Sequence, residues 1–166
     1  MRDRWFERTV VLLCHHTPEG ALGLVINRDG PVSIGRVVEK MSLAPPTDPD
    51  MPTWWGGPVS EGAGFVIWKG KADEEEGWNI GNGVAVSPSV ERLESLLDQG
   101  ESFHLALGYS GWGPGQLDGE LTSGAWIHVD SEPSVVFDTP LPDRYDSTLA
   151  LLGLTPETVW MTPIFE

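Results

Sequence analysis

The sequence predicts an α+β fold in one domain over residues 1–166, with a mixed, strongly bent β-sheet and about four helices packed on it. Two observations predict this class. Short apolar runs with β-branched residues, typical of strands, follow one another through turns, and amphipathic helices are interspersed without strict β-α-β alternation. A chain of this length with 40% hydrophobic residues is sufficient for one buried core.

The N-terminal part predicts a hairpin followed by a helix. Thr9–Cys14 and Ala21–Asn27 are apolar runs of the buried-strand type, and the polar segment His15–Gly20 is the expected turn between them. Ser33 is the expected N-cap of a helix that runs to about Met41. Its apolar stripe has helical spacing and consists of Ile34, Val37, Val38 and Met41.

Five more strands are predicted from short apolar runs, and the polar segments between them are expected as loops. The strands are Gly64–Trp68, Val84–Val86, Phe103–Tyr109, Trp126–Val129 and Val135–Phe137. Residues 44–53, rich in proline, and residues 69–79, with an acidic triplet, are expected to be exposed. A tight turn is expected at Gly56–Val59.

Helix signals recur in the second half of the chain. Ser87 is the expected N-cap of a helix with Pro88 at its first position and Gly100 after its end. Its buried stripe is predicted to be Val90, Leu93, Leu96 and Leu97. A last helix is predicted from about Leu141 to Leu152, with Leu141, Tyr145, Leu149 and Leu152 on one face.

The charge balance limits the classes of partner. The chain has 25 acidic and 10 basic residues, a formal net charge of −15. The densest basic group, Arg2, Arg4 and Arg8, is interleaved with Asp3 and Glu7. Because affinity for nucleic acid rests on clustered Lys and Arg, direct DNA binding is disfavoured.

The cysteine count and the hydropathy pattern predict a cytoplasmic protein. Cys14 is the single cysteine and cannot form an intrachain disulfide, which fits a reducing compartment. No apolar run reaches the roughly 18 residues of a membrane span, and the charged N-terminus lacks the apolar region of a signal peptide. We therefore expect no membrane partner.

Residues 108–121, called the signature segment below, are the most informative stretch. Five glycines and a proline surround Tyr109, Trp112, Gln116 and Glu120. Glycine at this density indicates positive φ values or a closely approached backbone. The segment therefore either cradles a ligand or forms a tight strand-to-helix corner. The eight tryptophans of the chain are expected chiefly in the core, with an exposed aromatic surface as the alternative.

Known catalytic patterns fit poorly. Ser110 lacks the Gly-x-Ser-x-Gly context, because Trp112 occupies the second glycine position. Asp118 and Glu120 diverge on a helix that starts near Gln116. Backbone N–H groups before that helix could meet a phosphate, although no Walker or dinucleotide spacing is present. Cys14 and its two neighbouring histidines have no partner pair, so no metal site is expected.

Several motifs together resemble the YqgE/AlgH family, in family order and over nearly the whole chain. They are Phe6–His16, Gly20–Asn27, Gly56–Val59 with Gly64–Val66, Leu107–Leu121, Ala125–Trp126, Val136–Asp138 and Pro142–Gly153. The resemblance implies a bacterial, cytosolic α+β protein with a barrel-like sheet. Members are described as transcriptional regulators because one of them is linked genetically to alginate production. The resemblance implies no cofactor and no particular reaction.

The resemblance also marks individual positions. The ligand- or partner-binding candidates are His16, Asn27, Tyr109, Trp112, Gln116 and Glu120. The positions interpreted as structural are Gly20, Gly23, Gly57, Pro58, Gly111, Gly115 and Trp126. Two ends depart from the family pattern: Met1–Phe6 matches only the end of the family's first strand region, and Val159–Glu166 replaces a Gly/Ala-rich terminus. A missing first strand would leave a sheet edge uncovered, which predicts a homodimer through that edge; a misassigned start codon is the simpler alternative.

The function expected from these features is that of a non-enzymatic regulatory or binding protein. Its partner, a protein or a small molecule, is not identified by the residues. The alternative is an enzyme for a small-molecule or phosphate ligand that uses the signature segment. That alternative requires His16, Asn27, Tyr109, Gln116 and Glu120 to converge on one pocket.

Overall fold

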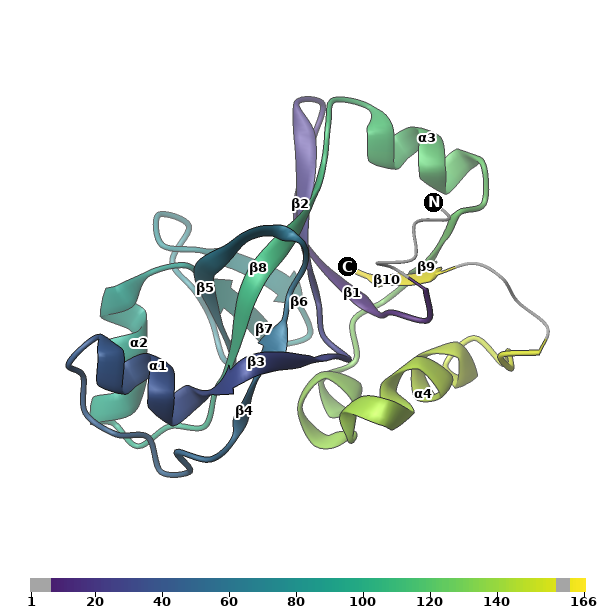
Figure 1. Ribbon diagram of the computed structural model, residues 1–166. Helices are drawn as coiled ribbons and strands as arrows, with labels where there is room; N and C mark the ends of the chain where they lie inside the picture. The colour runs from purple at the N-terminus through teal and green to yellow at the C-terminus, as the bar shows by residue number, and fades with distance from the viewer. Residues whose placement is uncertain (1–6, 158–161) are drawn as a thin grey trace.

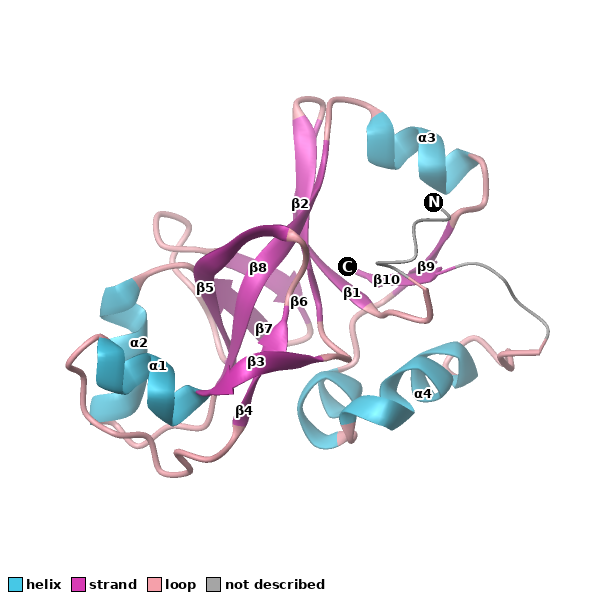
Figure 2. Cartoon of the chain, viewed as in Figure 1, coloured by secondary structure: helices cyan, strands magenta, loops and turns pink. Residues whose placement is uncertain are grey.

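The computed structural model describes residues 7–157 and 162–166, where ten strands form one sheet (Figures 1 and 2). The strands are β1 (Val11–Thr17), β2 (Gly20–Val25), β3 (Asp29–Ser33), β4 (Pro52–Trp55), β5 (Val59–Lys69), β6 (Trp78–Gly81), β7 (Val84–Ser87), β8 (His104–Trp112), β9 (Trp126–Val129) and β10 (Thr162–Phe165). The α-helices of the described part are α1 (Ile34–Lys40), α2 (Val90–Asp98), α3 (Gln116–Thr122) and α4 (Arg144–Ala150).

The sheet is mixed and strongly bent, which confirms the predicted α+β class. Hydrogen bonds link the strands in the order β6-β7-β5-β8-β2-β1-β10-β9, with β4 on β8 and β3 on β4. β10 runs parallel to β1 and β9, and β4 runs parallel to β8. The bend brings β6 against β1. No ladder joins these two strands within residues 7–157, so the barrel-like sheet stays open.

The core follows the alternation of side chains along the strands. On β1, Leu12 points into the bend of the sheet, whereas Val11 and Leu13 point to the opposite face under α3. Both faces of this strand are therefore buried, which is why its sequence is a continuous apolar run. Figure 1 shows α1 and α2 at one end of the sheet and α3 and α4 at the other.

The predicted helix stripes are only half covered. Ile34 and Val38 of α1 are buried, as are Leu93 and Leu96 of α2. At the ends of the same stripes, Met41 is 39% exposed and Val90 is 44% exposed. The uncovered ends lie next to each other in a groove described below.

The hairpin is tighter than expected. β1 continues through His15 and His16, and its turn contains only Pro18 and Glu19 before β2 begins at Gly20. A bulge at Cys14 shifts the register between Leu13 and His15. The strand pairing, rather than the polarity of the histidines, decides the end of β1.

Two local predictions are wrong. Val135–Phe137 is not a strand but part of a π-helical turn, Ser134–Asp138, because the Glu132 carbonyl accepts the N–H groups of Val135 and Val136. Short apolar runs do not distinguish these conformations by themselves. The N-cap of α2 is Ser89, whose hydroxyl accepts the Arg92 N–H, and not Ser87.

Strands β3, β4, β6 and β10 lie in segments without a predicted strand.

Both edges of β1 are occupied: β1 pairs with β2 on one side and with the C-terminal β10 on the other. The predicted homodimer edge therefore does not lie at β1, and Met1–Phe6 are outside the described residues. None of the described helices is long and apolar enough to cross a membrane.

Candidate functional site

The signature segment is half strand and half corner. β8 extends through Trp112, Gly113–Gly115 turns the chain, and α3 begins at Gln116. Gly115 has φ +72°, the left-handed region that favours glycine. Ser110 is fully buried, and its hydroxyl donates to the Gly56 carbonyl at 3.2 Å. That serine is thus packed in the sheet.

The Glu120 carboxylate is the shared acceptor of this corner. Its Oε1 accepts the indole N–H of Trp112 at 3.1 Å and that of Trp126 at 2.8 Å. The two rings contact edge to face, with centroids 5.5 Å apart. Trp112 is 5% exposed and Trp126 is 2% exposed, so both indole N–H groups need an internal acceptor.

Gln116 completes the same cluster. Its Oε1 accepts the Gly113 N–H at 2.9 Å, and its Nε2 donates to Glu120 Oε2 at 3.0 Å. The Gly113 N–H that a phosphate would need is therefore already bonded. Together Trp112, Gln116, Glu120 and Trp126 form what we call the Glu120 cluster, which holds α3 on β8 and β9.

His16 joins the hairpin to α3 beside this cluster. Its Nε2 lies 3.0 Å from Asp118 Oδ1, and both side chains are partly exposed. Asp118 and Glu120 diverge as predicted, one toward His16 and the other toward the indoles. Such a surface pair contributes at most about 1 kcal/mol to stability.

Asn27 is not part of this group. Its Oδ1 accepts the Val10 N–H at 2.8 Å, and its Nδ2 donates to the Arg8 carbonyl at 2.9 Å. Asn27 lies six positions after Ala21, the partner of His16 in the hairpin, which is about 20 Å along a strand. The structure therefore does not bring the five residues of the enzyme alternative to one pocket.

Replacing Asn27 by alanine is expected to lower the free energy of unfolding by about 1–3 kcal/mol, because the buried Val10 N–H loses its acceptor. Urea unfolding measures the change. Replacement of the partly exposed Asp118 by asparagine is the control, with an expected change below about 1 kcal/mol. Equal stability of Asn27→Ala and the wild type would contradict this role.

Two of the predicted structural glycines, Gly20 and Gly57, mark close backbone contacts. A Cβ on Gly20 would lie 2.6 Å from the Trp112 carbonyl oxygen, and one on Gly57 would lie 2.3 Å from the Tyr109 carbonyl carbon. Pro58 follows directly and leads into β5. The predicted positions Gly23 and Gly111 lie on the paired strands β2 and β8. Tyr109 packs its ring against Phe65, with centroids 6.0 Å apart.

A second feature was missed from the sequence: a column of stacked rings and cations. The Arg144 guanidinium lies 4.5 Å from the Trp54 ring centroid, and Trp54 stacks on His104 with centroids 4.3 Å apart. His104 stacks in turn on Phe137 at 6.1 Å, and Lys69 Nζ lies 5.5 Å from that ring. These five residues come from β4, β5, β8, the π-helical turn and α4.

Arg144 and the Nδ1 atom of His104 are buried in this column, whereas Lys69 at its end is exposed. Arg144 is 2% exposed, its Nε donates to the Thr139 carbonyl at 2.8 Å, and its Nη1 donates to the Ile26 carbonyl. Burial lowers the pKa of Arg144 to about 10. Burial, and secondarily the charge of Arg144, lowers the pKa of His104 to about 4. His104 Nδ1 is buried without a hydrogen-bond partner.

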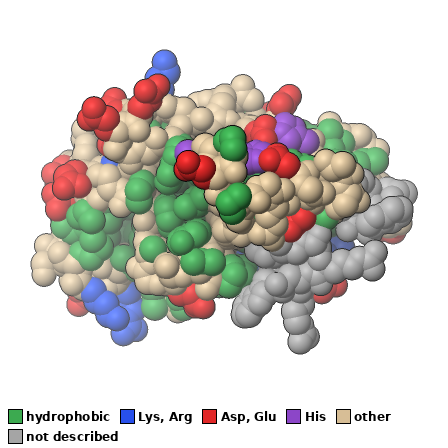
Figure 3. Space-filling model, turned by 90° about the horizontal axis from the view of Figure 1, so that it is seen from above, with side chains coloured by type: hydrophobic (Ala, Val, Ile, Leu, Met, Phe, Trp, Pro, Cys, Tyr) green, Lys and Arg blue, Asp and Glu red, His purple; other side chains and the backbone are tan. Residues whose placement is uncertain are grey.

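The surface feature that stands out is an apolar groove between α1, α2 and the outer face of β5 and β8. Its volume is about 220 Å³. The lining contains no charged side chain and consists of Val37, Met41, Gly62, Gly64, Val66, Pro88, Ser89, Val90, Leu93, Leu105 and Leu107. Figure 3 shows hydrophobic side chains gathered on the left half of the view, the side on which α1 and α2 lie in Figure 1. We call this feature the α1–α2 groove.

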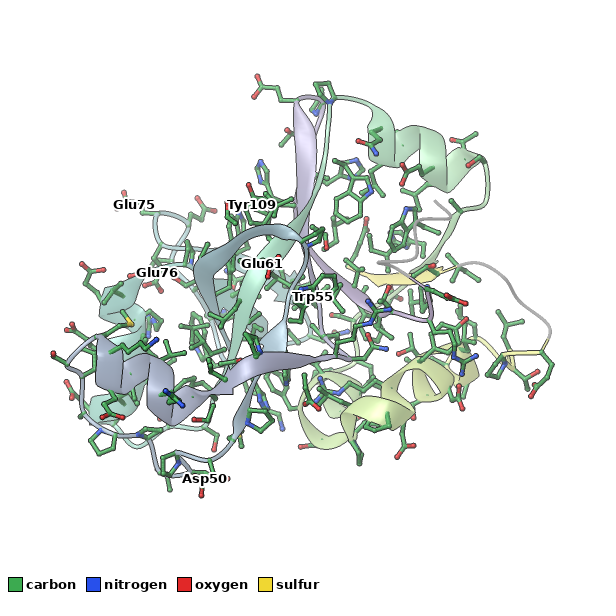
Figure 4. The ribbon with its side chains drawn as sticks, in the orientation of Figure 1. Asp50, Trp55, Glu61, Glu75, Glu76 and Tyr109 are labelled. Atoms are coloured by element: carbon green, nitrogen blue, oxygen red, sulfur yellow. The ribbon has the colours of Figure 1, made fainter. Side chains whose placement is uncertain are left out.

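Two other hollows are less suited to a ligand site. One, of about 420 Å³, lies between α1 and the loop before β4 and is lined in part by Arg36, Glu39 and Asp50. Figure 4 shows Asp50 at the far tip of that loop. The other, of about 190 Å³, lies beside His104. No group of His, Cys, Asp and Glu suited to a metal ion occurs within residues 7–157 and 162–166.

Comparison with known proteins identifies relatives over nearly the whole chain. The AlgH-like family model (DUF179) matches residues 1–157. A UPF0301 protein from Vibrio atlanticus (strain LGP32) is 36% identical over 162 residues, covering 93% of this chain and 87% of that protein. A UPF0301 protein from Variovorax paradoxus (strain S110) is 39% identical over 167 residues, covering 93% and 84%.

Solved structures agree with this assignment. The solution structure of the AlgH protein from Pseudomonas aeruginosa matches with a TM-score of 0.77 and 31% identity, over 95% of this chain and 86% of that one. The crystal structure of protein DIP2367 from Corynebacterium diphtheriae shares the fold, with a TM-score of 0.71 and 20% identity over 91% and 81% of the two chains. The chain therefore belongs to the AlgH-like, UPF0301 family.

Proposed function

We propose that this protein is a non-enzymatic binding protein of the cytoplasm, whose working surface is the α1–α2 groove and which regulates through a protein partner. The single observation that carries the proposal is the gathering of exposed apolar side chains. Met41 and Val90, at 39% and 44% exposure, are large hydrophobic residues that line the groove. Such a patch typically marks an interaction site.

The hydrogen bonds within the signature segment argue against catalysis by its side chains. Gln116 and Glu120 are engaged with each other, with two indoles and with a backbone N–H. A catalytic carboxylate needs access to a substrate, and Glu120 already accepts three hydrogen bonds, from Trp112, Trp126 and Gln116. The net charge of −15 favours action through a protein rather than through DNA.

The proposal is tested by filling the groove. Gly62→Val together with Gly64→Val places side chains over its floor, and the wild type and this variant are compared as baits in an extract of the source bacterium. A partner retained by the wild type and lost by the filled variant is the expected result. Equal retention by both baits would place the binding surface elsewhere.

A thermal-shift screen against metabolites and nucleotides tests the small-molecule alternative. A ligand at a hundred times its Kd stabilises its protein by about 2.7 kcal/mol. We expect no such stabilisation that depends on Gln116 or Glu120. A metabolite that stabilises the wild type, but not a Gln116→Ala variant, would favour the enzyme hypothesis.

A further inference from the structure

We infer that Met41 is an oxidation site through which peroxide regulates the α1–α2 groove. Oxidation of its thioether to the sulfoxide makes part of the apolar lining polar and weakens the binding of an apolar surface there. This inference deepens the proposed function and rests on it. It is carried by the exposure of Met41, by its fixed position at the end of α1, and by a lining without a free side-chain donor.

The first feature is the access of solvent to Met41. This residue is 39% exposed, whereas Met51 is partly buried against the core beneath α1 and α2, and Cys14 is buried. Burial also raises the pKa of the Cys14 thiol well above its usual range, so the reactive thiolate is scarce there. Within residues 7–157 and 162–166, Met41 is therefore the sulfur most accessible to a peroxide.

The second feature is the fixed backbone of Met41, which is the C-cap of α1. Its N–H donates to the Val37 carbonyl at 3.2 Å, and the N–H of Ser42 donates to the Glu39 carbonyl at 3.0 Å. Ser42 has φ +58°, a left-handed conformation that ends the helix at this point. Because these bonds hold the end of α1, an oxidised Met41 side chain remains at the groove that it lines.

The third feature is the chemistry of the lining. It contains no charged side chain, and among the lining residues Ser89 alone carries a hydroxyl. That hydroxyl donates to Glu91 Oε2 at 2.9 Å and accepts the Arg92 N–H at 3.3 Å. A sulfoxide oxygen that a partner covers therefore leaves water without a side-chain donor to replace it, which weakens binding. In the free protein water still reaches Met41, so oxidation leaves the fold stable.

The chemical step uses hydrogen peroxide as the oxidant. The Met41 sulfur attacks one peroxide oxygen, the S–O bond forms as the O–O bond breaks, and the leaving hydroxide takes the proton of the transferred oxygen to become water. The sulfur loses two electrons and the peroxide gains them. Methionine sulfoxide reductases restore the thioether with thiols, which are oxidised to a disulfide while the oxygen leaves as water. The modification is therefore reversible.

The first experiment locates the oxidation. The full chain is treated with hydrogen peroxide for increasing times, and its peptides are analysed by mass spectrometry. We expect Met41 to be oxidised before Met51, with an unchanged melting temperature at that stage, and we expect methionine sulfoxide reductases with dithiothreitol to restore the original mass. Equal rates at Met41 and Met51, or earlier oxidation of Cys14, would overturn the inference.

The second experiment measures the groove with Nile red, an uncharged apolar dye, by fluorescence titration. The dye signal lost in the variant Gly62→Val with Gly64→Val is the share bound in the groove. For this share, we expect oxidised wild type to bind at least about fivefold more weakly than untreated wild type. Met41→Leu, compared only with its own untreated form, is expected to change less than about twofold, because leucine is apolar and similar in size but has no sulfur. Met51→Leu, a change outside the groove lining, is the matched control and keeps the effect of the wild type.

Each other outcome overturns the inference. A dye signal that the filled variant retains in full, or equal weakening of oxidised wild type and oxidised Met41→Leu, would reject Met41 as the residue that controls the groove. The extract experiment distinguishes this failure from that of the proposed function. A partner lost by the filled variant but retained by oxidised wild type would leave the proposed function in place and reject the regulation. Equal retention by untreated wild type and the filled variant would reject the proposed function instead.

Discussion

Replacing Trp112 by alanine is expected to lower the free energy of unfolding by about 3–5 kcal/mol, the range for removing a buried indole. The ring is 5% exposed and packs edge to face on Trp126. Its loss also frees Glu120 Oε1 from one of its two indole donors. Urea unfolding monitored by circular dichroism measures the change, because the secondary structure reports unfolding when a tryptophan is removed.

Two further variants show whether the Glu120 cluster acts as one structural unit. Glu120→Ala leaves two buried indole N–H groups without an acceptor, which is expected to cost roughly 2–4 kcal/mol. Gln116→Ala removes bonds that are exposed to solvent and is expected to cost about 1 kcal/mol. Unchanged stability of both Trp112→Ala and Glu120→Ala would show that the segment is maintained for binding rather than for the fold.

Acidification is expected to remove about 3 kcal/mol of stability through His104 alone. The pKa of His104 is lowered from 6.5 to about 4 in the folded state. Above pH 6.5 the imidazole is neutral in both states and the stability is complete. Between pH 6.5 and 4 the unfolded chain takes up a proton that the folded chain does not, so the free energy of unfolding falls as pH falls. The span of about 2.5 pH units corresponds to roughly 3 kcal/mol.

The measurement is urea unfolding at several pH values for the wild type and for His104→Phe. Phenylalanine keeps a ring between Trp54 and Phe137 but does not titrate. Carboxylates such as Glu76, whose pKa is lowered mainly by its hydrogen bond to Arg92, contribute equally in both proteins. The variant is therefore expected to have a shallower pH dependence. Identical slopes for the two proteins between pH 6.5 and 4 would contradict the assignment.

Much of the local structure followed from periodicity and capping residues. The stripes of α1 and α2 and the apolar runs of β1, β2, β5 and β8 have strong patterns over several residues. The missed strands β3, β4, β6 and β10 are short or polar, and they exist because a partner strand supplies hydrogen bonds. Val135–Phe137 has a strand-like composition, yet the Glu132 carbonyl accepts hydrogen bonds from the N–H groups of Val135 and Val136.

The sequence could not show which of the candidate residues lie together in the fold and which lie apart. Trp112, Gln116, Glu120 and Trp126 converge, whereas Asn27 serves the backbone of residues 8–10 at the other end of β2. A motif records that residues occur together but not which donor meets which acceptor. His104 and Arg144 carried no motif that marked them as a stacked pair, since Trp54 between them comes from a third segment.

The sequence by itself determined the fold class, the acidic charge, the family and the strand-to-helix corner of the signature segment. The tertiary structure alone decided that Glu120 is the acceptor for two indoles, that β10 covers β1, and that Met41 and Val90 line one apolar groove. The physical reason is the range of the interactions. Periodicity, capping and composition depend on neighbours in the chain, whereas strand pairing and shared acceptors depend on which distant segments meet and in which register.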